Sequence, residues 1–124
     1  MPAHEQPTHR IARVNSLIQQ IVGATILPLT QESGALVTVS KVETTIDMKS
    51  AKIWISIVGP KDNAENDEKI LKLLRDNIYD IQGELNHKMH TKALPRIEFH
   101  LDTAPRYVQH IDELITQIHH EDES

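Results

Sequence analysis

Hydrophobic residues near the start of the chain recur every three or four positions. This spacing gives one apolar helical stripe made of Ile11, Val14, Leu17, Ile18, Ile21 and Val22. Thr8 is a suitable N-cap, and Pro28 disfavours helical geometry in the residue before it. The pattern therefore predicts a helix from Thr8 to about Leu27, followed by a loop over residues 28–35.

Between residues 37 and 57 the period changes to strict alternation. Val37 and Val39 alternate with polar residues, and so does a second run formed by Ala51, Ile53, Ile55 and Ile57. A period of two places these side chains on one face of a pleated sheet. A polar turn over residues 47–50 separates the two runs, and Gly59-Pro60 follows the second. The pattern predicts a β-hairpin.

A second helical stripe comprises Ile70, Leu73, Leu74, Ile78, Ile81 and Leu85. On an unbroken helix Glu84 and Lys88 would fall inside this stripe, where charges without partners are costly. A bend near Gly83 would turn both residues outward and let them form an i, i+4 ion pair. We therefore expect a long helix that bends near Gly83.

A third alternation follows Pro95, with Ile97, Phe99 and Leu101 on one side. The last stripe consists of Val108, Ile111, Leu114, Ile115 and Ile118, and predicts a C-terminal helix. This order of elements predicts an α+β fold, with a three-stranded sheet and helices packed on one face. We expect a disordered N-terminus over residues 1–7, one domain over residues 8–118 and an acidic disordered tail over residues 119–124.

The composition excludes several classes of function. The chain has 124 residues and no cysteine, which excludes disulfides, thiolate metal sites and cysteine nucleophiles. No apolar run approaches the ~20 residues of a membrane span, and the first residues do not resemble a signal peptide. A cytoplasmic protein that does not bind membranes is therefore expected.

The net charge of −5 is unevenly distributed along the chain. Five of the 18 acidic residues lie near the C-terminus, namely Asp112, Glu113, Glu121, Asp122 and Glu123. The other 13 acidic residues balance the 13 lysines and arginines. The body of the domain is thus neutral, which permits a basic face without requiring one.

Two motifs resemble the ribosome-binding factor A family. The hairpin carries Val42-Glu43, then Asp47-Met48, then the run Ala51-Lys52-Ile53-Trp54-Ile55-Ser56. The third strand carries Leu94-Pro95-Arg96-Ile97-Glu98-Phe99 followed by Asp102. The resemblance extends from about Arg10 to Ile118.

This resemblance implies a type II KH-like fold with an added C-terminal helix. It implies a non-enzymatic factor that binds the small (30S) ribosomal subunit and its 16S rRNA during late maturation. Other assembly factors are a further class of partner, and a monomer without cofactor or metal is expected. The chain departs from the family pattern in lacking an Ala-x-Gly helix break, because Asn77-Ile78-Tyr79 occupies the matching positions. Lys41 also stands where the family often has a small residue.

Eight residues are candidates for RNA contact. KH-type folds hold an RNA backbone at a helix N-terminus beside a tight turn, which here implicates Gly83 together with Lys88 and Lys92. The alternative is that Gly83 is a tolerated helical glycine. Arg10 and Arg13 begin the first helix, where they either meet phosphate or extend over the edge of the core.

The remaining candidates are Lys49, Lys52 and Trp54 of the hairpin. Trp54 points away from the buried face and offers a platform for a base or a protein partner. Alternatively, the C-terminal helix or neighbouring strand side chains cover the indole ring.

Neither enzymatic nor metal chemistry has support in the sequence. His87 and His90 lack a third ligand at a useful spacing, as does the pair His119-His120. No serine lies in a nucleophile-elbow context, and there is no glycine-rich phosphate loop. The rival to an RNA-binding factor is a protein–protein adaptor, because a KH-like fold does not by itself dictate RNA binding.

Overall fold

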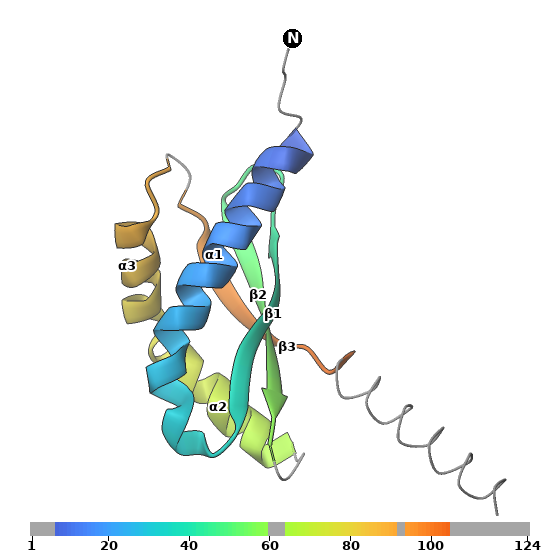
Figure 1. Ribbon diagram of the computed structural model, residues 1–124, viewed down its shortest axis with the longest axis vertical. Coiled ribbons are helices and arrows are strands. Elements are labelled where there is room, and N and C mark those ends of the chain that lie inside the picture. Colours follow the sequence, from blue (N-terminus) through green and yellow to red (C-terminus); the bar gives the residue numbers. More distant parts are fainter. Residues whose placement is uncertain (1–6, 60–63, 92–93, 105–124) are drawn as a thin grey trace, which may run out of the picture.

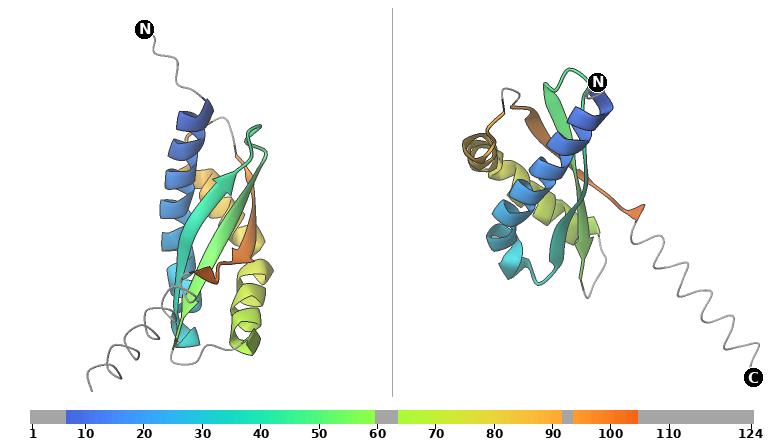
Figure 2. Two further views of the ribbon diagram at one scale, coloured as in Figure 1. Left: turned by 90° about the vertical axis from the view of Figure 1, so that its right-hand side faces the viewer. Right: turned by 45° about the horizontal axis from the view of Figure 1, so that its top comes forward.

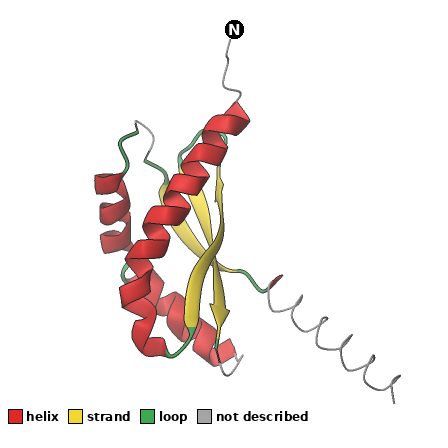
Figure 3. Ribbon diagram, viewed as in Figure 1, coloured by secondary structure: helices red, strands yellow, loops and turns green. Residues whose placement is uncertain are grey.

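The computed structural model describes residues 7–59, 64–91 and 94–104. Along the chain it has α1 (Pro7–Thr30), the short 3-10 helix η1 (Gln31–Ser33), β1 (Leu36–Thr44), β2 (Ser50–Val58), α2 (Ala64–Asp76), α3 (Ile78–Lys88) and β3 (Arg96–Leu101). Figures 1 and 3 show these elements. The expected C-terminal helix, the segment before Pro7 and the acidic tail lie outside the described residues.

The three strands form one mixed sheet in the order β1-β2-β3. β1 pairs antiparallel with β2, as the hairpin pattern predicts, and β3 pairs parallel with β2. The register places Val42 opposite Ile53 and Ile53 opposite Phe99, so the aliphatic side chains of all three strands lie on one face. Figures 1 and 2 show α1 lying across the sheet. The expected α+β architecture is confirmed.

One aliphatic core joins the sheet to α1, α2 and α3. Ile18 of α1, Ile53 of β2, Leu74 of α2 and Leu85 of α3 are fully buried in it. These side chains belong to the periodic sets that the sequence predicts. We call the buried face of the sheet the inner face. The opposite set of strand residues is mostly exposed or half-buried, and we call its side of the sheet the outer face.

The first helix is longer than predicted, because it continues through Pro28 to Thr30. Pro28 lies in the last turn, so its missing N–H removes one late helical hydrogen bond. The Thr30 hydroxyl donates to the Ile26 carbonyl at 3.0 Å, and both residues are buried. Burial of Ile26 and Thr30, together with this bond, therefore outweighs the local preference. The expected loop over residues 28–35 is correspondingly shorter, and Gly34 ends η1 in the left-handed region with φ 75°.

The long helix is broken at Asn77 and not at Gly83, so the expected bend is wrong. Asn77 has φ −103° and ψ 12°, and its side-chain amide donates to the Leu73 carbonyl at 2.8 Å. Gly83 lies inside α3. The break re-aims α3 so that Glu84 and Lys88 face outward, and they form the expected ion pair at 3.4 Å. The helix break that was expected near Gly83 thus lies six residues earlier, at Asn77.

Side chains from the helices bond the backbone at both outer strands of the sheet. Asn15 Oδ1 accepts from the Thr44 N–H at 3.1 Å, and Gln19 donates to the Val39 carbonyl at 3.0 Å. On the other side, Gln82 bonds the Pro95 carbonyl and the Ile97 N–H, each at 2.9 Å. These contacts occupy backbone groups that would otherwise invite pairing with another strand.

Candidate nucleic-acid interface

Helix α1 carries basic residues and no acidic ones. Arg10 and Arg13 are exposed on its first turns, and the sequence from Pro7 to Thr30 contains no Asp or Glu. The N-terminus of a helix is also the positive end of its dipole. Cations oppose this dipole, so their position here costs stability while it strengthens the positive field that a phosphate would meet.

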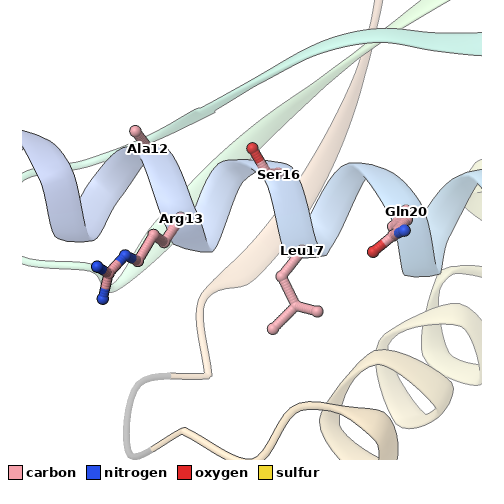
Figure 4. A pocket seen from close by; sticks show the side chains of 5 residues that line it. All are labelled: Ala12, Arg13, Ser16, Leu17 and Gln20. Carbon is pink, nitrogen blue, oxygen red and sulfur yellow. The ribbon is translucent and has the colours of Figure 1, made fainter.

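An open groove of about 390 Å³ runs along this part of α1. It is lined by Ala12, Arg13, Ser16, Leu17 and Gln20. Figure 4 shows Arg13 and Leu17 pointing to one side of α1, and Ala12 and Ser16 pointing to the other. The groove thus combines a cation, two polar groups and an aliphatic surface.

The turn of the hairpin lies at the same end of the molecule as the start of α1 (Figure 1). The bond between Asn15 and Thr44 fixes α1 against the end of β1, and the Arg96 N–H donates to the Lys49 carbonyl at 3.0 Å. Lys49 is exposed in this turn. The neighbouring Asp47 accepts from the Thr45 hydroxyl and the Lys49 N–H, and these bonds hold the pKa of Asp47 below its ordinary value.

Lys52 lies on the outer face between two carboxylates. The register places it opposite Glu43 on β1 and Glu98 on β3. Facing side chains on neighbouring strands are close enough to interact. These two acidic residues reduce the positive potential at Lys52, so Lys52 is a weaker phosphate contact than the arginines of α1.

Trp54 packs against side chains of the two neighbouring strands. Its ring lies 5.3 Å from that of His100 on β3, and Lys41 Nζ lies 5.0 Å from the ring centroid. Both arrangements are favourable for an aromatic ring. The structure therefore supports the interpretation in which strand side chains cover much of the indole, although Trp54 remains partly accessible.

Two of the three candidates of the expected bend, Gly83 and Lys88, lie within α3 and not at a turn. Gly83 and Lys88 lie in the middle and at the end of α3, and Lys88 is paired with Glu84. Lys92 lies outside the described residues. Since the break is at Asn77, neither Gly83 nor Lys88 flanks it.

The junction between α2 and α3 was not among the predicted candidates for RNA contact. Beside it is a hollow of about 270 Å³ lined by Arg75, Ile78, Glu98, Phe99 and His100. Arg75 donates to the Phe99 carbonyl at 3.0 Å. The Asn77-Ile78-Tyr79 match to the family's Ala-x-Gly was the signal that pointed here.

The exit of the chain from β3 was also missed. Asp102 accepts from the Ser40 hydroxyl at 2.6 Å and from the Ala104 N–H at 3.0 Å. The Ser40 bond is the main reason why the pKa of Asp102 lies below its ordinary value. Ser40 stands at a register shift in β1, between Val39 and Lys41, so this bulge directs its hydroxyl to Asp102.

The described residues contain no group of three or more His, Asp or Glu side chains that could hold a metal ion. No described helix is long and apolar enough to cross a membrane.

Comparisons of the sequence with known proteins identify relatives of this chain. A family model described as ribosome-binding factor A matches residues 10–115. The chain is 35% identical over 95 residues to ribosome-binding factor A of Pelodictyon phaeoclathratiforme, covering 75% of this chain and 77% of that protein. The counterpart from Opitutus terrae is 31% identical over 111 residues, covering 90% and 88%.

A solved structure supports the fold. The crystal structure of ribosome-binding factor A from Thermus thermophilus superposes with a TM-score of 0.61 at 19% identity, covering 73% of this chain and 94% of that one. This likeness confirms the expected KH-like fold. Taken with the family model over residues 10–115, it shows that this chain belongs to the ribosome-binding factor A family.

Proposed function

We propose that this protein binds the small (30S) ribosomal subunit and its 16S rRNA during late maturation, as a non-enzymatic factor in the cytoplasm. Membership of the ribosome-binding factor A family supports this function. By occupying an RNA site on the immature particle, the protein would hold that site in an immature conformation until maturation is complete.

The RNA-binding surface that the geometry favours is a basic end formed by Arg10, Arg13 and Lys49. The observation that carries this choice is the absence of acidic residues from α1. On α2 and α3, by contrast, Lys69, Lys72 and Lys88 each lie within 3.5 Å of a carboxylate one turn away. α1 supplies no carboxylate of its own, so Arg10 and Arg13 lack the i, i+4 acidic neighbours that weaken the attraction of Lys69, Lys72 and Lys88 for phosphate.

The groove beside Arg13 adds a second kind of contact to the basic end. Its apolar wall is Leu17, and Ser16 and Gln20 offer hydrogen-bonding groups. Single-stranded rRNA exposes both phosphates and unstacked bases. A phosphate on Arg13 and a base beside Leu17 would therefore use both properties of the groove.

Co-sedimentation with purified ribosomal particles over a salt series tests this function. We expect the protein to sediment with free small subunits and to be depleted from assembled ribosomes. Binding should weaken as salt rises, because neutralising phosphates releases counterions. Equal partition between free subunits and assembled ribosomes would contradict a maturation factor, and binding that does not depend on salt would favour the protein–protein adaptor.

A pair of double variants tests the surface. Arg10→Gln with Arg13→Gln should lower affinity and reduce the salt slope by ~0.7 to 0.9 for each phosphate that is no longer neutralised. The control is Lys69→Gln with Lys72→Gln on α2, which removes the same charge from paired positions. Equal reductions of affinity in the two double variants would show that net charge matters and that the basic end does not.

A further inference from the structure

The outer face of the sheet contains an apolar patch that no helix of the described part covers. We call Leu36, Thr38, Trp54 and Val58 the outer patch, and Ser56, which lies on the same face between Trp54 and Val58, is buried. Leu36 and Val58 are paired across β1 and β2, and they are 59% and 41% exposed. β3 ends opposite Ile55, so Ser56 and Val58 have a strand neighbour on the β1 side and none on the β3 side.

Trp54 lies at the edge of this patch, and its indole is incompletely satisfied. Nε1 is buried and has no hydrogen-bond partner among the described residues. The ring is otherwise partly accessible beside His100. Any element that covers the outer patch would change the surroundings of this ring.

The chain leaves β3 beside the outer patch, and its direction there is fixed. The Asp102 N–H continues the sheet by donating to the Ile55 carbonyl at 2.8 Å. The Ser40 hydroxyl donates to the Asp102 carboxylate and contacts the Trp54 carbonyl at 3.2 Å. The other carboxylate oxygen of Asp102 accepts from the Ala104 N–H, which is the bond an N-cap makes at the start of a helix. A helix that begins here starts next to Trp54.

The sequence that follows supplies a matching apolar face. Its stripe consists of Val108, Ile111, Leu114, Ile115 and Ile118, with Asp112 and Glu113 outside the stripe. A helix over residues 104–118 would be about 22 Å long, so it would fit within the ~30 Å length of a nine-residue strand. We propose that residues 105–118 of this chain form a helix that packs its stripe on the outer patch of the same molecule.

Residues 105–118 of the same molecule are favoured over other occupants of the outer patch for two reasons, their covalent attachment and their charge. The segment is attached within three residues of Asp102, which gives it a high effective concentration at the patch. The segment also carries two acidic residues, Asp112 and Glu113, against one arginine, Arg106, so RNA would compete with a tethered segment of net negative charge. A docked segment would therefore repel phosphate from the outer face and leave the basic end as the RNA-binding surface.

The single tryptophan of the chain makes the test direct. Trp54 emission and acrylamide quenching are compared between the full chain and a chain lacking residues 105–124. We expect the deletion to shift the emission to longer wavelength and to increase quenching. Deletion of residues 119–124 alone should change neither, because these residues contribute nothing to the stripe. Identical emission and quenching in the full and the shortened chain would overturn the proposal.

Point variants keep the test valid where a deletion perturbs folding. Ile111→Asp places a charge in the stripe and should reproduce the red shift. Thr116→Asp places the same charge on the opposite side of the segment and should leave emission unchanged. Equal effects of the two variants would overturn the proposal.

The same measurement over a dilution series identifies the occupant. Emission that does not change on dilution supports docking within one molecule. A red shift of the full chain on dilution, with a dimer in size-exclusion chromatography, would show that a second copy occupies the patch and would overturn it.

Discussion

Helix α1 and the helix pair α2–α3 bury similar aliphatic residues but expose different charges. Ile18 of α1 and Leu74 of α2 are both fully buried in the common core. On the exposed side, α1 has two arginines and no acidic residue, whereas α2 and α3 contain three i, i+4 ion pairs. Both regions thus contribute buried residues to one core, and they differ in the acidic residues that their own sequences place beside their cations.

This difference shows why the net charge of the chain is a poor guide to its partner. Exposed ion pairs contribute ~0–1 kcal/mol to stability, but they cancel much of the field that a distant phosphate would experience. The positive field near α1 therefore owes its strength to a helix sequence that contains two arginines and no acidic residue. A chain with a net charge of −5 can bind RNA when those cations are gathered at one end.

The largest change in the free energy of unfolding should come from substitutions in the buried faces. There we expect α1 and α2 to respond equally. Ile18→Ala on α1 and Leu74→Ala on α2 should each lower the free energy of unfolding by ~2–5 kcal/mol, because each leaves a cavity in a core that cannot fully collapse. Urea unfolding measures both. A much smaller decrease for Ile18→Ala would mean that α1 is an appendage used for binding, and the comparison would fail.

A smaller effect is expected when an acidic residue is added to α1. Ser16→Glu places a carboxylate one turn from Arg13, at the wall of the groove. RNA affinity should fall, and the salt slope should decrease by ~0.7 to 0.9, as when one phosphate is no longer neutralised. Binding to small subunits over a salt series measures this.

Ala24→Glu on the same helix is the matched control. It adds the same charge about 12 Å further along the axis, beyond a Debye length from Arg13. Equal reductions of affinity for the two variants would show that α1 acts through its total charge and not through the basic end.

Periodicity predicted most of the fold, and it failed where tertiary contacts decide the geometry. The strands and their buried faces follow from alternation at Val37, Ile53 and Phe99. The break at Asn77 could not be predicted in this way, because Ile78 and Ile81 continue the stripe of Leu74 as if the helix were unbroken. Bonds from helix side chains to β3, such as that of Gln82, favour the break and have no local signature.

The candidate site was predicted in parts. Arg10, Arg13 and Lys49 were each predicted as candidates for RNA contact, but their common location depends on the packing of α1 against the hairpin. Lys52 and Trp54 were placed correctly on the outer face. The carboxylates beside Lys52 and the packing of Trp54 on His100 come from strand pairing over long sequence distances.

Two glycines give a matched stability test of α1 and α3. A Cβ at Gly23 or Gly83 would meet nothing within 4 Å, and neither has a positive φ. Alanine should therefore stabilise each helix by up to ~1 kcal/mol. Thermal unfolding measures the change, and Gly34→Ala, where φ is 75°, should destabilise as a control. A decrease in the stability of Gly83→Ala would instead indicate that the helix bends at Gly83, as the sequence pattern predicted.

The smallest effect should come from removing one acidic partner on α3. Glu84→Gln leaves Lys88 without the carboxylate that lies 3.4 Å away, and both side chains are half exposed. The free energy of unfolding should therefore change by no more than ~0.5 kcal/mol. If the ion pair with Glu84 is what weakens the attraction of Lys88 for phosphate, the RNA affinity of Glu84→Gln should rise slightly at low salt. Glu65→Gln, at the start of α2 and far from the basic end, is the control for the change in net charge. An equal rise in both variants would mean that pairing is irrelevant, and that α1 differs from α2 and α3 only in its total charge.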